Sequence, residues 1–127
     1  MSERPGDGLP RRVDKPWGHE LIWSLTDQYC GKILVIETGE RLSLQRHERK
    51  DEWIHVLSGR MRLYLEDDGG EVVVGELGAG EGAHVPTGRI HRYEAIERVE
   101  LVEVSTPELD DVVRLEDDYG REQTTAP

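Results

Sequence analysis

The chain has 127 residues and carries 27 acidic against 16 basic side chains, a net charge of −11, which argues against nucleic acid or an anionic membrane as partner. No stretch approaches the roughly 20 apolar residues of a membrane span, and residues 1–12 lack the apolar segment of a secretory signal. A single cysteine, Cys30, excludes an internal disulfide and is typical of a reducing compartment. The sequence therefore predicts a cytoplasmic protein with one small domain.

The predicted elements are strands throughout. Residues 1–12 are polar with proline and glycine, and we expect them to form a flexible arm. Short apolar or alternating runs then predict strands separated by turns at 20–23, 32–36, 60–65, 71–74, 83–85 and 99–104. Many short strands with regular glycine turns predict an all-β jelly roll over residues 13–121, followed by a tail at 122–127. The state of residues 107–120 stays open.

Metal-ligand side chains gather in two groups between residues 39 and 91. The first group holds Gln45, His47 and Glu52, and the second contributes His91. Because residues i and i+2 of a strand point to one face, Gln45 and His47 are expected to point together. Glu52 begins the next strand, and His91 follows a tight proline–glycine turn. Two imidazoles and a carboxylate form a facial ligand set for a divalent ion, with the Gln45 amide oxygen as a weaker fourth ligand.

Both groups resemble the two motifs of the cupin superfamily. Cupins usually carry histidine at the position of Gln45. With glutamine there, residues 39–47 resemble the cupin domain of type II mannose-6-phosphate isomerases, and residues 15–18 and 113–121 resemble other parts of the same domain. The resemblance implies a double-stranded β-helix, the cupin jelly-roll barrel, with one divalent ion of zinc, manganese, cobalt, nickel or iron. It also implies a sugar phosphate as the small-molecule substrate.

The chain departs from that family at two positions beside the carboxylate ligand. The arginine that the family uses, and that is implicated in catalysis, corresponds to Lys50, and the family's histidine after the glutamate corresponds to Trp53. Arginine and lysine are not interchangeable where a bidentate fork is needed. The resemblance therefore implies the fold more directly than it implies the activity.

Three classes of function follow. The first is a sugar-phosphate aldose–ketose isomerase resembling mannose-6-phosphate isomerase, in which a metal polarises the carbonyl and a base moves a proton between adjacent carbons. The base would be a metal-bound hydroxide, Lys50 or Tyr93, while Arg89 and Lys32 are candidates to bind the substrate. The second is an iron-dependent oxygenase, and the third is a cupin that binds a sugar or nucleotide-sugar without turnover. We take the first as the leading prediction.

The strand that begins at Glu52 also predicts assembly. Alternation directs Ile54 and Val56 to the same side as Glu52 and sends Trp53 and His55 to the other side. An exposed tryptophan on a small sandwich is usually covered by a partner. Because many cupins also pair, we expect an isologous homodimer.

Overall fold

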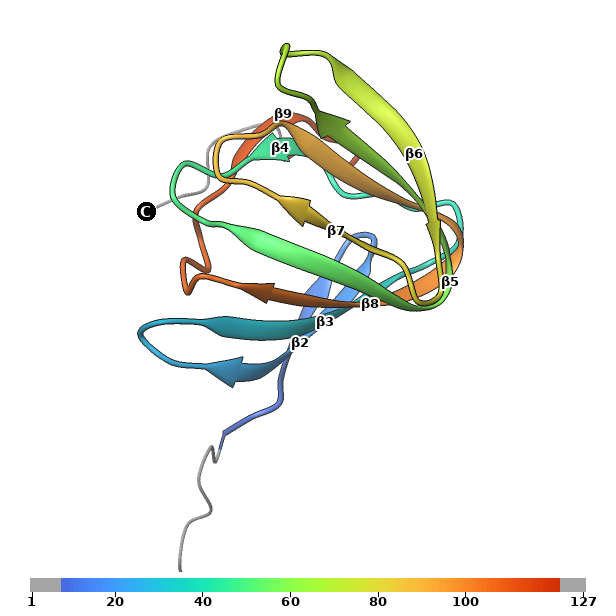
Figure 1. The fold of residues 1–127 in the computed structure, drawn as a ribbon. Helices are drawn as coiled ribbons and strands as arrows, with labels where there is room; N and C mark the ends of the chain where they lie inside the picture. The colour runs from blue at the N-terminus through green and yellow to red at the C-terminus, as the bar shows by residue number, and fades with distance from the viewer. Residues whose placement is uncertain (1–7, 122–127) are drawn as a thin grey trace, which may run out of the picture.

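Residues 8–121 are described in the computed structural model, and within them the chain forms nine strands and no helix (Figure 1). The strands are β1 (Arg11–Lys15), β2 (Gly18–Leu25), β3 (Cys30–Ile36), β4 (Leu44–Arg46), β5 (Glu52–Glu66), β6 (Val72–Gly78), β7 (Gly82–Val85), β8 (His91–Ser105) and β9 (Val113–Glu116). The predicted all-β class is confirmed. Across residues 8–121, no helix has the length and apolarity that a membrane crossing requires.

The two longest strands, β5 and β8, close the fold. They pair with each other in antiparallel register along most of their length, with shifts in register between Val56 and Met61. On its other edge β5 pairs first with β7 and then with β6, while β8 pairs with β4 at its start and with β3 at its end. Each long strand therefore belongs to two groups of strands, and Figure 1 shows both curving around the molecule.

Glycine is required where β5 bends. Gly59 has a φ of +86°, and a Cβ at this position would clash with the carbonyl oxygen of Arg98 on β8. An L side chain here would be strained by both the backbone conformation and the close approach of the neighbouring strand. The bend brings the two halves of β5 around one core.

The core lies inside the curled sheet, and burial alternates strictly over the first five residues of β5. Glu52, Ile54 and Val56 are buried, whereas Trp53 and His55 are exposed, as the sequence predicts. The buried apolar cluster consists of Trp17, Leu34, Ile36, Leu42, Ile54, Val56, Met61, Leu63, Val85, Tyr93, Ala95, Val99 and Leu101. One end of this interior is polar rather than apolar, and that end contains the candidate site.

The structure differs from the sequence prediction at both ends of the described chain. β1 begins at Arg11, inside the predicted arm of residues 1–12, because Arg11 and Arg12 pair with Ile22 and Leu21 of β2. In the segment left open, β9 forms and pairs with β4. The rest of the predicted arm, up to residue 7, and the predicted tail at 122–127 lie outside the described residues.

Candidate metal centre

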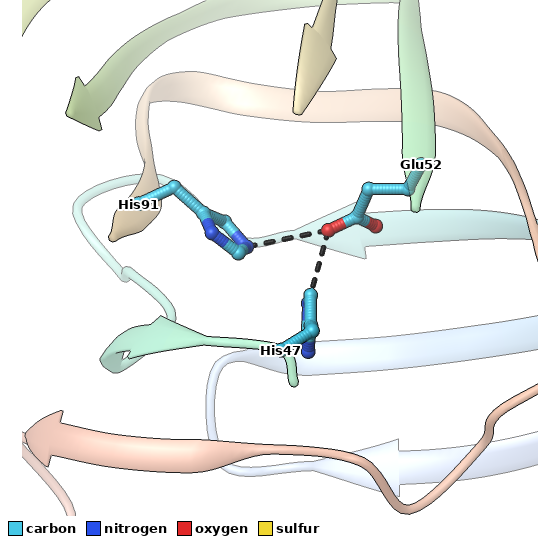
Figure 2. Close-up of side chains that lie close together, drawn as sticks. All are labelled: His47, Glu52 and His91. Carbon is cyan, nitrogen blue, oxygen red and sulfur yellow. Dashed lines mark hydrogen bonds and ion pairs between the residues drawn. The ribbon is translucent and has the colours of Figure 1, made fainter. Parts of the chain in front are cut away.

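Three buried side chains from separate elements converge on one point. His47 follows β4, Glu52 opens β5 and His91 opens β8, and one ligand atom from each lies within 4.8 Å of the others. Figure 2 shows both imidazoles directed at the same carboxylate. Glu52 Oε1 lies 3.1 Å from His47 Nε2 and 3.2 Å from His91 Nε2. The structure thus brings together three of the four ligands that the sequence predicts.

The hydrogen bond at Nδ1 of each histidine determines whether its Nε2 carries a hydrogen or a lone pair. His47 Nδ1 lies 2.6 Å from the carbonyl oxygen of Asp111, and His91 Nδ1 lies 2.9 Å from that of Arg89. A carbonyl oxygen only accepts, so each Nδ1 carries a hydrogen and a neutral ring has its lone pair on Nε2. Both lone pairs then face a carboxylate oxygen that also has only lone pairs. Protons or a metal cation must sit between these atoms, and this outer contact to Nδ1 is usual for metal-binding histidines.

Gln45 lies beside this cluster on β4. It is the register partner of His91, and residues directly opposite in antiparallel strands share a face. Its Oε1 accepts a hydrogen bond of 2.7 Å from the Ser43 hydroxyl and lines the same pocket. An amide oxygen has two lone pairs, so one remains for a metal. Gln45 therefore stays a candidate for the weak fourth ligand.

Lys50 is buried between two carboxylates. Its Nζ lies 2.8 Å from Glu103 Oε2 and 3.6 Å from Glu52 Oε2. Burial alone would lower the pKa of Lys50, but the charges of Glu103 and Glu52 outweigh it and hold this pKa above its ordinary value. Burial, followed by the charge of Glu52, raises the pKa of Glu103 to about 7. Lys50 is therefore a charged ammonium that compensates the two carboxylates. A lysine that holds its proton this firmly is unsuited to the predicted role as a base.

Glu103 is a pocket residue that the sequence prediction missed. It follows Val99 and Leu101 at alternate positions of β8, and all three are buried. In register it lies opposite Lys32 on β3 and Ile54 on β5, which places it on the inner face of the sheet. The sequence does contain a signal for this position, because an acid that alternates in step with two apolar residues of a strand points to the same buried face.

Tyr93 lines the pocket and lies beside His91, in keeping with their spacing of two residues on β8. The two rings are 5.5 Å apart between centroids, and the Tyr93 hydroxyl is buried without a hydrogen-bond partner in the described part of the chain. Burial and then the negative charge of Glu52 raise the pKa of Tyr93 well above its ordinary value. Tyr93 thus keeps its proton and can donate it in a hydrogen bond.

The two predicted substrate-binding cations have different positions. Lys32 lines the pocket and pairs with Glu20 at 3.2 Å. Arg89 does not lie with these residues: its guanidinium donates to the Glu66 carbonyl oxygen at 3.0 Å and pairs with Asp68 beside a separate groove. Arg89 belongs to the turn before β8, where the alternation of a strand does not apply.

Asp111 is a second residue that the sequence prediction missed. Its carboxylate accepts backbone N–H bonds from Glu48, Arg49 and Lys50, at 3.1, 2.7 and 2.9 Å. Burial opposes ionisation, but these N–H groups hold the pKa of Asp111 below its ordinary value. Asp111 also accepts from His47 through its carbonyl oxygen, so it fixes both the His47 ring and the turn that carries Lys50. The contact spans more than 60 residues, so no local pattern signals it.

Trp53 lies on the outside of the molecule. Its side chain is 53% exposed and its ring stacks on His84, with centroids 5.1 Å apart. The departure from the family's histidine at this position therefore does not alter the pocket. Only the replacement of the family's arginine by Lys50 affects the buried site.

Comparison with known proteins supports the resemblance. Residues 5–117 match the family model described as mannose-6-phosphate isomerase C-terminal. Mannose-1-phosphate guanylyltransferase ManC of Salmonella typhimurium is 37% identical over 119 residues, covering 89% of this chain and 24% of that protein. Alginate biosynthesis protein AlgA of Pseudomonas aeruginosa is 30% identical, covering 86% of this chain and 23% of its own length. The chain thus spans about a quarter of these relatives.

Solved structures confirm the fold. KdgF from Halomonas sp. superimposes with a TM-score of 0.67 at 22% identity, covering 79% of this chain and 88% of that chain. A mutant of the oxalate decarboxylase OxdC of Bacillus subtilis gives a TM-score of 0.74 at 18% identity, covering 84% of this chain and 30% of that chain. These neighbours are cupin jelly-roll proteins. At such low identity they show the fold alone, and they confirm the predicted cupin barrel.

Proposed function

Because the chain belongs to the mannose-6-phosphate isomerase C-terminal family, we propose that it is a metal-dependent isomerase of a phosphorylated sugar, with mannose 6-phosphate as substrate. The observation that carries the proposal is the convergence of His47, Glu52 and His91, whose facing lone pairs fit a divalent cation. Zinc, manganese, cobalt, nickel or iron would suit these ligands. Such an ion would polarise the sugar carbonyl when bound. The guanylyltransferase relatives, named for mannose 1-phosphate, support a phosphorylated sugar.

The residues around the metal centre supply groups that an aldose–ketose exchange needs. The reaction moves a proton between neighbouring carbons, so one group must take the proton and return it. Glu103 is a buried carboxylate of this pocket that lies next to the metal cluster without belonging to it, and Lys50 balances its charge. The other, Asp111, is already engaged by backbone N–H groups of the turn before β5. Tyr93 offers a phenol hydrogen to a sugar oxygen. We therefore assign the proton transfer to Glu103 and the role of fixed cation to Lys50.

Proton exchange at the sugar tests the activity. The metal-reconstituted protein in deuterated water should exchange the C2 proton of mannose 6-phosphate and form the ketose, as followed by NMR. Glu103→Gln should abolish the exchange while metal content, measured by elemental analysis, stays intact. If the wild-type protein exchanges no C2 proton with any phosphorylated hexose, whichever metal is bound, the isomerase proposal fails.

Variants of Lys50 separate a fixed cation from a base. Lys50→Arg should keep turnover because it keeps the positive charge between Glu103 and Glu52. Lys50→Ala should abolish turnover, but it leaves two buried carboxylates without a counter-charge, a change that costs about 3–5 kcal/mol. Circular dichroism and metal analysis of Lys50→Ala must therefore accompany the assay. Loss of turnover in Lys50→Arg, with fold and metal retained, would argue for a base instead.

A cupin that binds a sugar or nucleotide-sugar without turnover is the second candidate. The observation that favours it is Lys50 in place of the family's arginine, because a lysine ammonium does not provide a bidentate fork. Binding of mannose 6-phosphate without proton exchange would support this function. An iron-dependent oxygenase is the third candidate, and metal analysis separates it, since it requires bound iron.

A further inference from the structure

Besides Lys50, four cationic side chains line the pocket that contains the metal centre. They are Lys15 at the end of β1, Lys32 on β3, Arg114 on β9 and Arg121 after it. Burial lowers the pKa of Lys15, and the charges of Lys32, Arg114 and Arg121 lower it further, against an opposing effect of Glu20. The four charges are therefore close enough to repel one another, in a chain whose net charge is −11.

Strand register places Arg114 in line with the metal centre. Gln45 on β4 is the register partner of His91 on one side and of Arg114 on the other. Partners in antiparallel strands share a face, so His91, Gln45 and Arg114 form one row across three strands. Two strand spacings of about 4.8 Å separate the backbones of His91 and Arg114 by roughly 10 Å. The row leads from the metal ligands to the cationic group.

Among residues 8–121, two of the four charges have an ion-pair partner and two do not. Lys32 pairs with Glu20 at 3.2 Å, and Arg121 pairs with Asp117 at 2.9 Å. Within residues 8–121, no hydrogen bond or ion pair engages the ammonium of Lys15 or the guanidinium of Arg114, and Arg114 Nε is buried without an acceptor. Leaving a charged donor buried and unpaired is costly, whereas an anion bound here would satisfy it.

We propose that Lys15 and Arg114, beside Arg121, form a phosphate subsite that orients the sugar phosphate with its carbonyl end towards the metal centre. The sugar part of this inference rests on the proposed function, but the anion subsite does not. A phosphate monoester carries a charge of about −1.5 to −2 at pH 7, which matches the two unpaired positive charges. The planar fork of Arg114 suits bidentate contact with phosphate oxygens, and Lys15 adds a point charge.

Calorimetric titration of the metal-loaded protein tests the subsite with inorganic phosphate, mannose 6-phosphate and mannose as probes. Arg114→Gln should weaken binding of both phosphates roughly 10- to 100-fold, the range for losing charge-assisted hydrogen bonds, and leave mannose binding unchanged. Arg114→Lys should lose less. The matched control is Arg60→Gln, since Arg60 is exposed and pairs with Glu76 outside this pocket.

Folding and metal content must be measured on the same samples. Arg114→Gln removes an unpaired charge, so its melting temperature should not fall. Phosphate at a few times the wild-type Kd should raise the melting temperature of the wild type more than that of this variant. Equal metal content in both excludes the metal as the cause of any difference. Equal phosphate affinity in the wild type and Arg114→Gln overturns the subsite. Phosphate binding that depends on Arg114, with no C2 proton exchange, overturns the isomerase proposal alone.

Discussion

Replacing Asp111 with alanine should destabilise the protein and loosen its metal site together. The carboxylate accepts three backbone N–H bonds from the turn between β4 and β5, and this turn lies between the candidate ligands His47 and Glu52. Asp111 is only 4% exposed, so these bonds form away from bulk water. The turn is therefore held by a side chain from the C-terminal segment, not by its own residues.

The loss of stability in Asp111→Ala depends on which of the three N–H groups can be hydrated once the carboxylate is removed. Glu48 and Arg49 are exposed, so their N–H groups can hydrate in the variant, whereas Lys50 is buried and its N–H loses its acceptor. A lost bond to a charged acceptor costs about 1.5–3 kcal/mol where the donor stays buried, and less where water replaces it. The sum is about 3 kcal/mol. For a domain of this size that corresponds to a drop of roughly 10 °C in melting temperature.

Thermal unfolding by circular dichroism and metal titration measure the two effects. Asp110→Ala is the matched control, because Asp110 is the exposed neighbour of Asp111. In the presence of a chelator, the difference in melting temperature reports the three hydrogen bonds alone. The metal affinity of Asp111→Ala should fall about 10- to 100-fold, as for partners that orient metal ligands. Equal melting temperature and metal affinity in the two variants would refute this reasoning.

Three further predictions concern the metal, the assembly and one tyrosine. Elemental analysis should find most of the metal lost in His47→Ala and less of it lost in Gln45→Ala, because a neutral amide is a poorer ligand than imidazole. An unchanged metal content in His47→Ala would exclude this site. Light scattering at micromolar concentration should give a homodimer that Trp53→Glu dissociates, since half of the Trp53 side chain is exposed; a monomeric wild type would contradict it. Burial and a hydrogen bond to Glu40 raise the pKa of Tyr119 to about 12, so the stability from its protonated form should persist below pH 10 and be lost as the pH rises through 12. Absorbance titration should show this pKa falling in Glu40→Gln, and an unchanged value would show that burial alone sets it.

Local patterns in the sequence predicted the strands and the side chains of His47, Glu52 and His91 that converge, because both depend on short-range geometry. Alternation after Glu52 correctly separated buried Ile54 from exposed Trp53, since successive side chains of a strand point to opposite faces. The same rule failed for Arg89. This residue is two positions before His91 but lies in the turn that precedes β8, so its side chain is not bound to the inner face of the sheet.

The residues that the sequence did not reveal depend on contacts between distant segments. Asp111 reaches a turn more than 60 residues earlier, and Arg114 faces the pocket only because β9 pairs with β4 beside Gln45. Neither contact produces a periodic pattern in the sequence. The acidic C-terminal segment that contains both residues is equally typical of a solvated surface. Glu103 differs, since its phase with Leu101 on β8 marks it as inward-facing. A buried acid at an alternating apolar position is the one signal that local reasoning offered here.

The distribution of charge explains how an acidic chain can favour an anionic ligand. Exposed charges are screened beyond about 8 Å at physiological ionic strength, so most of the net charge of −11 has little effect inside the pocket. Partly buried charges are screened less, and in the pocket Lys15 and Arg114 are the ones without an ion-pair partner among residues 8–121. Raising the salt concentration should therefore weaken phosphate binding only modestly. A steep loss of affinity with salt would instead indicate that exposed basic residues hold the phosphate.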